Sequence, residues 1–216
     1  MKNVIALDGP AASGKSTIAR EIARILNFAN VSSGGFYRAI TWLALESGAD
    51  TKSPQAVAEV LAKAKLEYGF NDQGAVVFVN GIDPTPYLKD ENINKNVSPV
   101  AQTPEVRDNI NEGLRTLGNL RDCVIEGRDI GTIVFPDTKF KFYIDASPEV
   151  RAQRRQAEGG ADEIAKRDKM DSTRALAPLI AAKDAIIVDS THLTVQQVLA
   201  EICDHLRRLG LDVPQQ

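Results

Sequence analysis

The short stretch at residues 8–17 constrains the fold of this chain more than any other part of its sequence. It reads D-G-P-A-A-S-G-K-S-T and fits the pattern G-x-x-x-x-G-K-[ST]. The fixed positions of that pattern are Gly9, Gly14, Lys15 and Ser16. The apolar residues 4–7 before it predict a buried strand, and apolar residues after it recur at helical spacing, at Ile18, Ile22, Ile25 and Leu26. The sequence therefore predicts a strand, a glycine loop and a helix in succession.

A strand, a glycine loop and a helix in this order form a site for phosphate groups. The glycines let successive backbone N–H groups point inward, and the helix N-terminus adds positive potential. Lys15 is a flexible cation that can reach terminal phosphates, and the Ser16 hydroxyl suits Mg²⁺. The alternative is a glycine-rich turn before an ordinary helix. Because the motif and both flanks agree, we predict a nucleoside triphosphate site at Gly9, Pro10, Ala11, Ala12, Ser13, Gly14, Lys15, Ser16 and Thr17.

The composition is that of an ordinary globular domain. The 216 residues are 43% hydrophobic and 25% charged, which predicts one α/β core with room for an inserted subdomain. The net charge of −3 argues against a dedicated nucleic-acid binder. No export signal or membrane-length apolar run is visible, so we expect a reducing cytoplasm, with Cys123 and Cys203 as core thiols. We also expect a monomer without nucleic-acid or membrane partners.

Strands and helices alternate along the chain, which predicts a parallel sheet with helices on both faces and ligands at the carboxyl ends of the strands. The predicted core strands, besides residues 4–7, are 28–31, 123–126, 140–145 and 185–189. Helices are predicted from about 39 to 46, 54 to 65 and 104 to 117, and from 148 and 195 onward. Caps before prolines at Ser53 and Thr103, and a capping box at Thr194 and Gln197, mark three of the starts. The packing stripe of the last helix is Val195, Val198, Leu199, Ile202 and Leu206.

In residues 66–83 the sequence pattern changes from that of helices to that of short strands. The stretches 66–70, 75–79 and 82–83 read as short strands separated by turns at 71–74 and 80–81. The second turn is Asn-Gly, the strongest short signal for a hairpin. We predict a small antiparallel meander inserted into the α/β core.

Three polar runs place arginines beside predicted strand ends or in loops. They are residues 33–38, 126–132 and 167–174. The planar guanidinium group suits phosphate oxygens, and phosphoryl transfer depends mainly on positioning and charge neutralisation. The runs predict a second phosphate-bearing ligand. Residues 189–191 follow the last predicted strand. The sequence leaves two roles open for them: they cap a helix, or they lie near the base of the nucleoside triphosphate.

Together these motifs make the chain similar to the bacterial cytidylate kinases, a family of the P-loop nucleoside monophosphate kinases. The likeness runs from end to end, through D-G-P-x-x-S-G-K-S, S-G-x-x-Y-R, G-R-D-x-G-T-x-V-F-P-D, D-A-S-x-E-x-R-A-x-R-R, R-D-x-x-D-x-x-R and V-D-S-T. The resemblance implies a three-layer α/β/α fold with a five-stranded parallel sheet, an acceptor-binding insert containing a small antiparallel sheet, and a short lid. The implied bounds are core 1–32, 119–150 and 175–216, acceptor region 33–118 with the meander at 66–88, and lid 151–174.

The resemblance also implies Mg²⁺-dependent transfer of the γ-phosphoryl group of ATP to CMP or dCMP. Arg154 would join the glycine loop in binding ATP. The implied acceptor-binding residues are Ser33, Tyr37, Arg38, Ser98, Arg107, Arg128, Asp129, Arg167, Asp171 and Arg174. Those implied in catalysis are Lys15, Arg128, Arg167 and Arg174. Ser16 would bind Mg²⁺, and Glu126, where many relatives carry Asp, would bind it through water.

The resemblance assigns Ser98, Arg107 and Asp129 to the cytosine, and hydrogen-bond chemistry agrees. Cytosine presents an amino donor and two acceptors, which a carboxylate, a hydroxyl and a guanidinium complement. Such a site rejects purines and disfavours uracil. The rival interpretations are a kinase for uridylate, adenylate or a metabolite, and a GTP switch, although residues 94–97 read N-K-N-V and fail the N-K-x-D pattern. Residues 156–166 are shorter than the matching segment of many relatives, which predicts altered closure of the lid.

Overall fold

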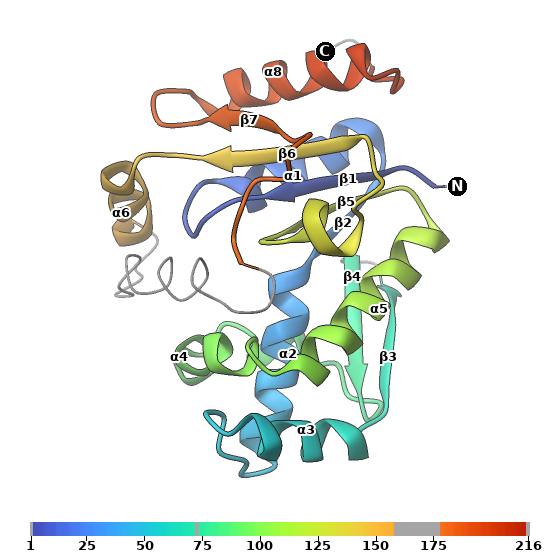
Figure 1. Ribbon diagram of the computed structural model, residues 1–216, viewed down its shortest axis with the longest axis vertical. Helices are drawn as coiled ribbons and strands as arrows, with labels where there is room; N and C mark the ends of the chain where they lie inside the picture. The colour runs from blue at the N-terminus through green and yellow to red at the C-terminus, as the bar shows by residue number, and fades with distance from the viewer. Residues whose placement is uncertain (1, 72–73, 158–177, 215–216) are drawn as a thin grey trace. The chain divides into compact units, whose positions relative to one another are not determined.

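The computed structural model describes residues 2–71, 74–157 and 178–214 (Figure 1). The chain forms two compact units. The sheet unit holds the chain up to Val31 and again from Arg121 onward, and the insert unit runs from Ser32 to Leu120. The finer division into core segments, acceptor region and lid stays a prediction.

The sheet unit is built on a five-stranded sheet with the strand order β2-β5-β1-β6-β7. The strands are β2 (Ala29–Ser32), β5 (Cys123–Gly127), β1 (Val4–Asp8), β6 (Phe140–Asp145) and β7 (Ile186–Asp189). β1 pairs in parallel with β5 and β6, and β6 pairs in parallel with β7. β1 is therefore central, and the carboxyl ends of these strands meet at one edge. The predicted α/β class and the five-stranded parallel sheet are confirmed.

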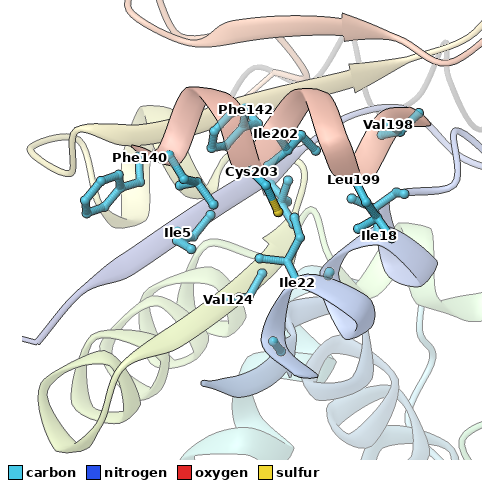
Figure 2. Packing of buried hydrophobic residues seen from close by; sticks show 14 of the residues in the cluster. Ile5, Ile18, Ile22, Val124, Phe140, Phe142, Val198, Leu199, Ile202 and Cys203 are labelled. Atoms are coloured by element: carbon cyan, nitrogen blue, oxygen red, sulfur yellow. The ribbon is translucent and has the colours of Figure 1, made fainter. Parts of the chain in front are cut away.

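Helices α1 (Lys15–Leu26) and α8 (Val195–Arg208) cover one face of this sheet with apolar side chains (Figure 2). Ile22 of α1 and Ile202 of α8 are fully buried in the same cluster as Phe142 of β6. Each such side chain contributes about 1.5–3 kcal/mol through its removal from water. This cluster anchors α1, and with it the loop that precedes α1.

Helix α8 begins with the predicted capping box. The Thr194 hydroxyl accepts from the Gln197 N–H at 3.2 Å, and the Gln197 side chain accepts from the Thr194 N–H at 2.9 Å. The predicted packing stripe is buried except at Val195, which is 39% exposed. That part of the prediction is wrong because Val195 lies in the first turn, so the buried stripe starts one turn later at Val198 and gains Cys203.

Two further helical segments follow strand ends in the sheet unit. The π-helix η2 (Ile130–Val134) comes after β5, and α6 (Pro148–Ala157) comes after β6, at the predicted proline start. Both therefore begin at the edge of the sheet where the strands end. None of the helices in the described parts of the chain combines the length and the apolar character needed to span a membrane.

The insert unit is mainly helical. Its elements are α2 (Ser33–Glu46), α3 (Pro54–Lys63), β3 (Leu66–Asn71), β4 (Gly74–Val79), η1 (Thr85–Tyr87), α4 (Glu91–Val100) and α5 (Pro104–Leu120). Helix α2 begins at Ser33, before the predicted start near residue 39. The buried side chains of Phe36, Ile40 and Leu43 form a helical stripe, which outweighs the weak helix propensity of the two glycines after Ser33.

The predicted meander is a two-stranded antiparallel hairpin of β3 and β4. The Asn80–Gly81 turn forms as expected, with both residues at positive φ, 52° and 80°. Beyond it only one bridge, between Val79 and Ile82, continues the pairing. The predicted third strand is therefore wrong: Ile82 and Asp83 after the turn are followed by Pro84, which lacks a donor for a ladder. The small antiparallel sheet itself is confirmed.

One helix of the insert unit was not predicted, and the cap of another differs from the prediction. Helix α4 was not predicted, because polar residues and Pro99 obscure the buried stripe of Ile93, Val97 and Val100. Helix α5 starts at Pro104 as predicted. The hydroxyl of Thr103 does not cap it, since this buried oxygen has no hydrogen-bond partner among the described residues.

Candidate active site

The phosphate loop lies between the last residue of β1 and the first turn of α1. Gly9 and Gly14 have φ of +154° and +92°, and Ala12 also lies in the left-handed region at 58°. A Cβ atom on Gly9 would lie 2.1 Å from the carbonyl oxygen of Ile144. Only glycine therefore fits at the first fixed position, where the loop backbone presses against the end of β6.

The polar groups of this loop suit a chain of phosphates. The Ser13 hydroxyl is buried and has no hydrogen-bond partner among the described residues, and such a donor requires an acceptor. Lys15 is buried, with its Nζ donating to the Pro10 carbonyl at 3.0 Å, so its charge is held inside the loop. Ser16, at the second position of α1, is exposed. The residues from Gly9 to Thr17 thus form a cradle that fits a nucleoside triphosphate with its Mg²⁺.

Two arginines of α6 donate hydrogen bonds to carbonyl groups of the phosphate loop. Arg154 Nη1 donates to the Ser13 carbonyl at 3.1 Å and to the Ser190 hydroxyl at 3.0 Å, and its Nη2 donates to the Ser190 carbonyl at 2.8 Å. Buried Arg151 donates to the carbonyls of Ala146 at 3.0 Å and Ala11 at 3.3 Å. The structure thus places Arg154 beside the loop, and its contact with the donor nucleotide stays a prediction.

Sequence reasoning assigned no role to Arg151, and it left Ser190 between a helix cap and a position near the donor base. Neither residue belongs to the glycine motif. The available signal was their position just after strands β6 and β7, at the carboxyl edge of the sheet.

Asp8 was also missed, although it precedes the motif directly. Its buried carboxylate accepts from the backbone N–H groups of Ile130 at 2.8 Å and Gly131 at 2.7 Å. Burial raises the pKa of Asp8 from 3.8 to about 6, against the lowering effects of these two bonds and of Lys15, while Asp129 adds to the increase. The end of β1 is therefore bonded to the turn after β5.

The end of β5 and the turn after it carry three of the predicted site residues, Glu126 in the strand and Arg128 and Asp129 in the turn. Glu126 and Asp129 are 6% and 4% exposed, and Arg128 is half-buried. Gly127 pairs in register with Asp8, so all three residues lie at the same sheet edge as the phosphate loop. No group of three or more His, Cys, Asp or Glu side chains that could hold a metal occurs in the described ranges. The role of Glu126 in binding Mg²⁺ stays a prediction.

The other described acceptor-binding candidates lie in the insert unit. Arg107 of α5 is 4% exposed, its guanidinium lies 5.7 Å from the centroid of the Tyr37 ring, and its Nη1 donates to the Ala101 carbonyl at 3.2 Å. Arg38 of α2 donates to Asn94 Oδ1 at 3.2 Å and to the Gly34 carbonyl at 2.9 Å. The structure thus brings Tyr37 and Arg107 together and holds both arginines in fixed orientations.

Five predicted acceptor-binding residues remain. Ser33 is the first residue of α2 and is buried, and Ser98 is half-buried on α4. Arg167, Asp171 and Arg174, with the part of the predicted lid from residue 158 to 174, lie outside the described residues.

A parallel sheet whose central strand leads through a glycine loop into a helix defines a P-loop nucleotide-binding protein. A solved structure from Thermus thermophilus, 16% identical, matches 98% of this chain and 99% of that chain with a TM-score of 0.50, which supports the fold alone.

Sequence comparisons define the family. A family model described as cytidylate kinase matches residues 5–208. A cytidylate kinase of Shouchella clausii is 41% identical over 211 residues, which cover 93% of this chain and 94% of the relative. One of Geobacillus thermodenitrificans is 42% identical over 211 residues, with 93% and 94% covered. The chain belongs to the cytidylate kinase family.

Proposed function

We propose that this protein is a cytidylate kinase that transfers the γ-phosphoryl group of ATP to CMP or dCMP, giving ADP and CDP or dCDP. The observation that carries the proposal is the phosphate loop between β1 and α1, with Gly9 packed against Ile144 and Lys15 buried within it, in a chain of this family. The acceptor's own phosphate oxygen is the nucleophile. It is already ionised at neutral pH, so the reaction requires no strong general base.

The donor side is formed by residues of the sheet unit. The loop N–H groups and the Ser13 hydroxyl bind phosphate oxygens, and Lys15 neutralises the charge that spreads over the transferred group. Arg154, held by Ser13 and Ser190, lies against the donor nucleotide. The hydroxyl of Ser16 would bind Mg²⁺, with Glu126 acting through water, and the ion would supply positive charge against the phosphates.

The acceptor side uses arginines and a set of groups that read the base. Asp129 accepts from the cytosine amino group, while Ser98 and Arg107 pair with the other polar positions of the ring edge. The burial of Arg107 and its bond to Ala101 fix the direction of its guanidinium before any nucleotide binds, which reduces the entropy lost on binding.

The remaining arginines bind the phosphate and sugar of the acceptor. They are Arg38, Arg128, Arg167 and Arg174, acting with Ser33, Tyr37 and Asp171. Closure of the lid excludes water so that ATP is not hydrolysed. We propose that the protein acts as a cytoplasmic monomer on small nucleotides alone.

A panel of nucleoside monophosphates with ATP and Mg²⁺, following diphosphate formation, tests the function. CMP and dCMP should react, UMP should react more slowly, and AMP and GMP should not. The Asp129→Ala variant should lose affinity for CMP far more than for ATP. Equal turnover of all four bases, or equal losses for CMP and ATP in the variant, would contradict base reading.

A further inference from the structure

Asp8 connects two parts of the sheet unit that are far apart in sequence. It is the last residue of β1, directly before Gly9, and is 4% exposed. One carboxylate oxygen accepts from the Ile130 N–H at 2.8 Å and the other from the Gly131 N–H at 2.7 Å. Both oxygens of this carboxylate therefore have backbone partners in the turn that follows β5.

These two N–H groups are the first of η2, and the opening N–H groups of a helix have no partner within the helix. Asp129 stands at the capping position, with φ of −147° and ψ of 25°, but its side chain makes no capping bond. Asp8 supplies the acceptors instead. The cap thus comes from a neighbouring strand, and it fixes the backbone next to the Asp129 carboxylate.

We propose that Asp8 is a positioning residue for acceptor recognition: by holding the N–H groups of Ile130 and Gly131, it sets the backbone that carries Arg128 and Asp129. This inference rests on the proposed function, in which Asp129 reads cytosine.

The phosphate loop is held by other contacts, although it begins at the next residue. Gly9 presses against the Ile144 carbonyl, Arg151 bonds to the Ala11 carbonyl, and Arg154 bonds to the Ser13 carbonyl. None of these contacts involves the Asp8 side chain, which acts on the loop through its electrostatic interaction with Lys15. A change at Asp8 should therefore weaken acceptor binding more than donor binding, although Asp8 directly precedes the loop that binds the donor.

The Asp8→Asn variant tests this inference with little change in volume. An amide offers one acceptor oxygen in place of two, so one N–H of η2 loses its partner. We expect the KM for CMP to rise about tenfold, while the ATP dissociation constant, measured without CMP, stays within about twofold of wild type. Amide hydrogen exchange at residues 130 and 131 should become faster. Asp137→Asn, the same change at an exposed carboxylate after η2, is the matched control and should alter none of these values.

A folded Asp8→Asn protein with an unchanged KM for CMP, or with equal losses for CMP and ATP, would overturn the inference. Amide hydrogen exchange in the wild-type protein gives a second test, which a folding defect of the variant cannot affect. If the amides of Ile130 and Gly131 exchange as fast as exposed amides, the proposed cap does not exist. A wild-type protein that fails to phosphorylate CMP would refute the proposed function instead, so the two failures are distinguishable.

Discussion

A single buried hydroxyl, that of Ser190, joins three segments of the sheet unit. It accepts from Arg154 Nη1 at 3.0 Å, and it lies 3.1 Å from the Ser13 carbonyl oxygen and 2.9 Å from that of Asp145. One hydroxyl proton can be donated to only one of these two carbonyls at a time. Ser190→Ala therefore removes one accepted and one donated hydrogen bond while leaving the backbone in place.

The expected magnitude follows from these contacts. The donated bond, to a buried carbonyl, stabilises the fold by about 1 kcal/mol, and the bond from half-buried Arg154 adds less because water replaces part of it. The free energy of unfolding should fall by about 1–2 kcal/mol, which lowers Tm by roughly 2–8 °C in a chain of this size. Arg154 keeps its bonds to the carbonyls of Ser13 and Ser190. The ATP dissociation constant should therefore rise only about five- to tenfold.

Calorimetric titration with ATP and thermal unfolding measure the two effects. Ser53→Ala is a matched control, because it removes another serine hydroxyl, the one that caps α3 by accepting from the Ala56 N–H at 3.3 Å. It should lower stability by about 1 kcal/mol without changing ATP binding. If Ser190→Ala binds ATP within twofold of wild type, or no more weakly than Ser53→Ala does, the reasoning that Ser190 positions Arg154 is refuted.

Three other perturbations address the loop and its flank. Lys15→Ala should reduce kcat about 10²–10³-fold while the circular dichroism spectrum stays native, and near-normal turnover would exclude the loop as the catalytic phosphate site. Gly9→Ala should destabilise the protein by several kcal/mol, because its Cβ would lie 2.1 Å from the Ile144 oxygen, whereas Gly35→Ala, with open space around its Cβ, should be neutral or stabilising in chemical unfolding. The Asp8 pKa of about 6 lies above its usual 3.8. Between these two pH values the native state therefore keeps a proton that the unfolded state has released. Raising the pH through that window should therefore lower the free energy of unfolding by up to about 3 kcal/mol, and Asp8→Asn should remove this part of the pH dependence; an unchanged dependence would contradict the assignment.

The phosphate loop could be predicted because its information is local. The glycines, Lys15 and the flanking apolar residues lie within a few positions of one another, and the structure forms β1, the loop and α1 where the pattern predicts them. The same holds for the capping box at Thr194 and for the Asn80–Gly81 turn. Each depends on neighbours in the chain rather than on tertiary contacts.

The supporting contacts could not be predicted, since their partners are distant in sequence. Asp8 bonds to N–H groups 122 and 123 positions away, and Ser190 lies near a carbonyl 177 positions away. The identity of these side chains does not reveal such partners, because the sheet order that brings them together is a property of the whole chain. Helix α4 was missed for a different reason: its buried stripe of Ile93, Val97 and Val100 stands among polar residues, and Pro99 lies in its last turn.

The burial of both cysteines has a practical consequence for labelling chemistry. Cys123 and Cys203 are the only cysteines of the chain and are 0% and 2% exposed, and burial raises the pKa of Cys123 to about 11. Few thiolates are thus available to maleimides while the protein is folded. One cysteine introduced on the surface of each unit would carry the dyes, so fluorescence transfer between them could follow the enzyme through its catalytic cycle without replacement of either native cysteine.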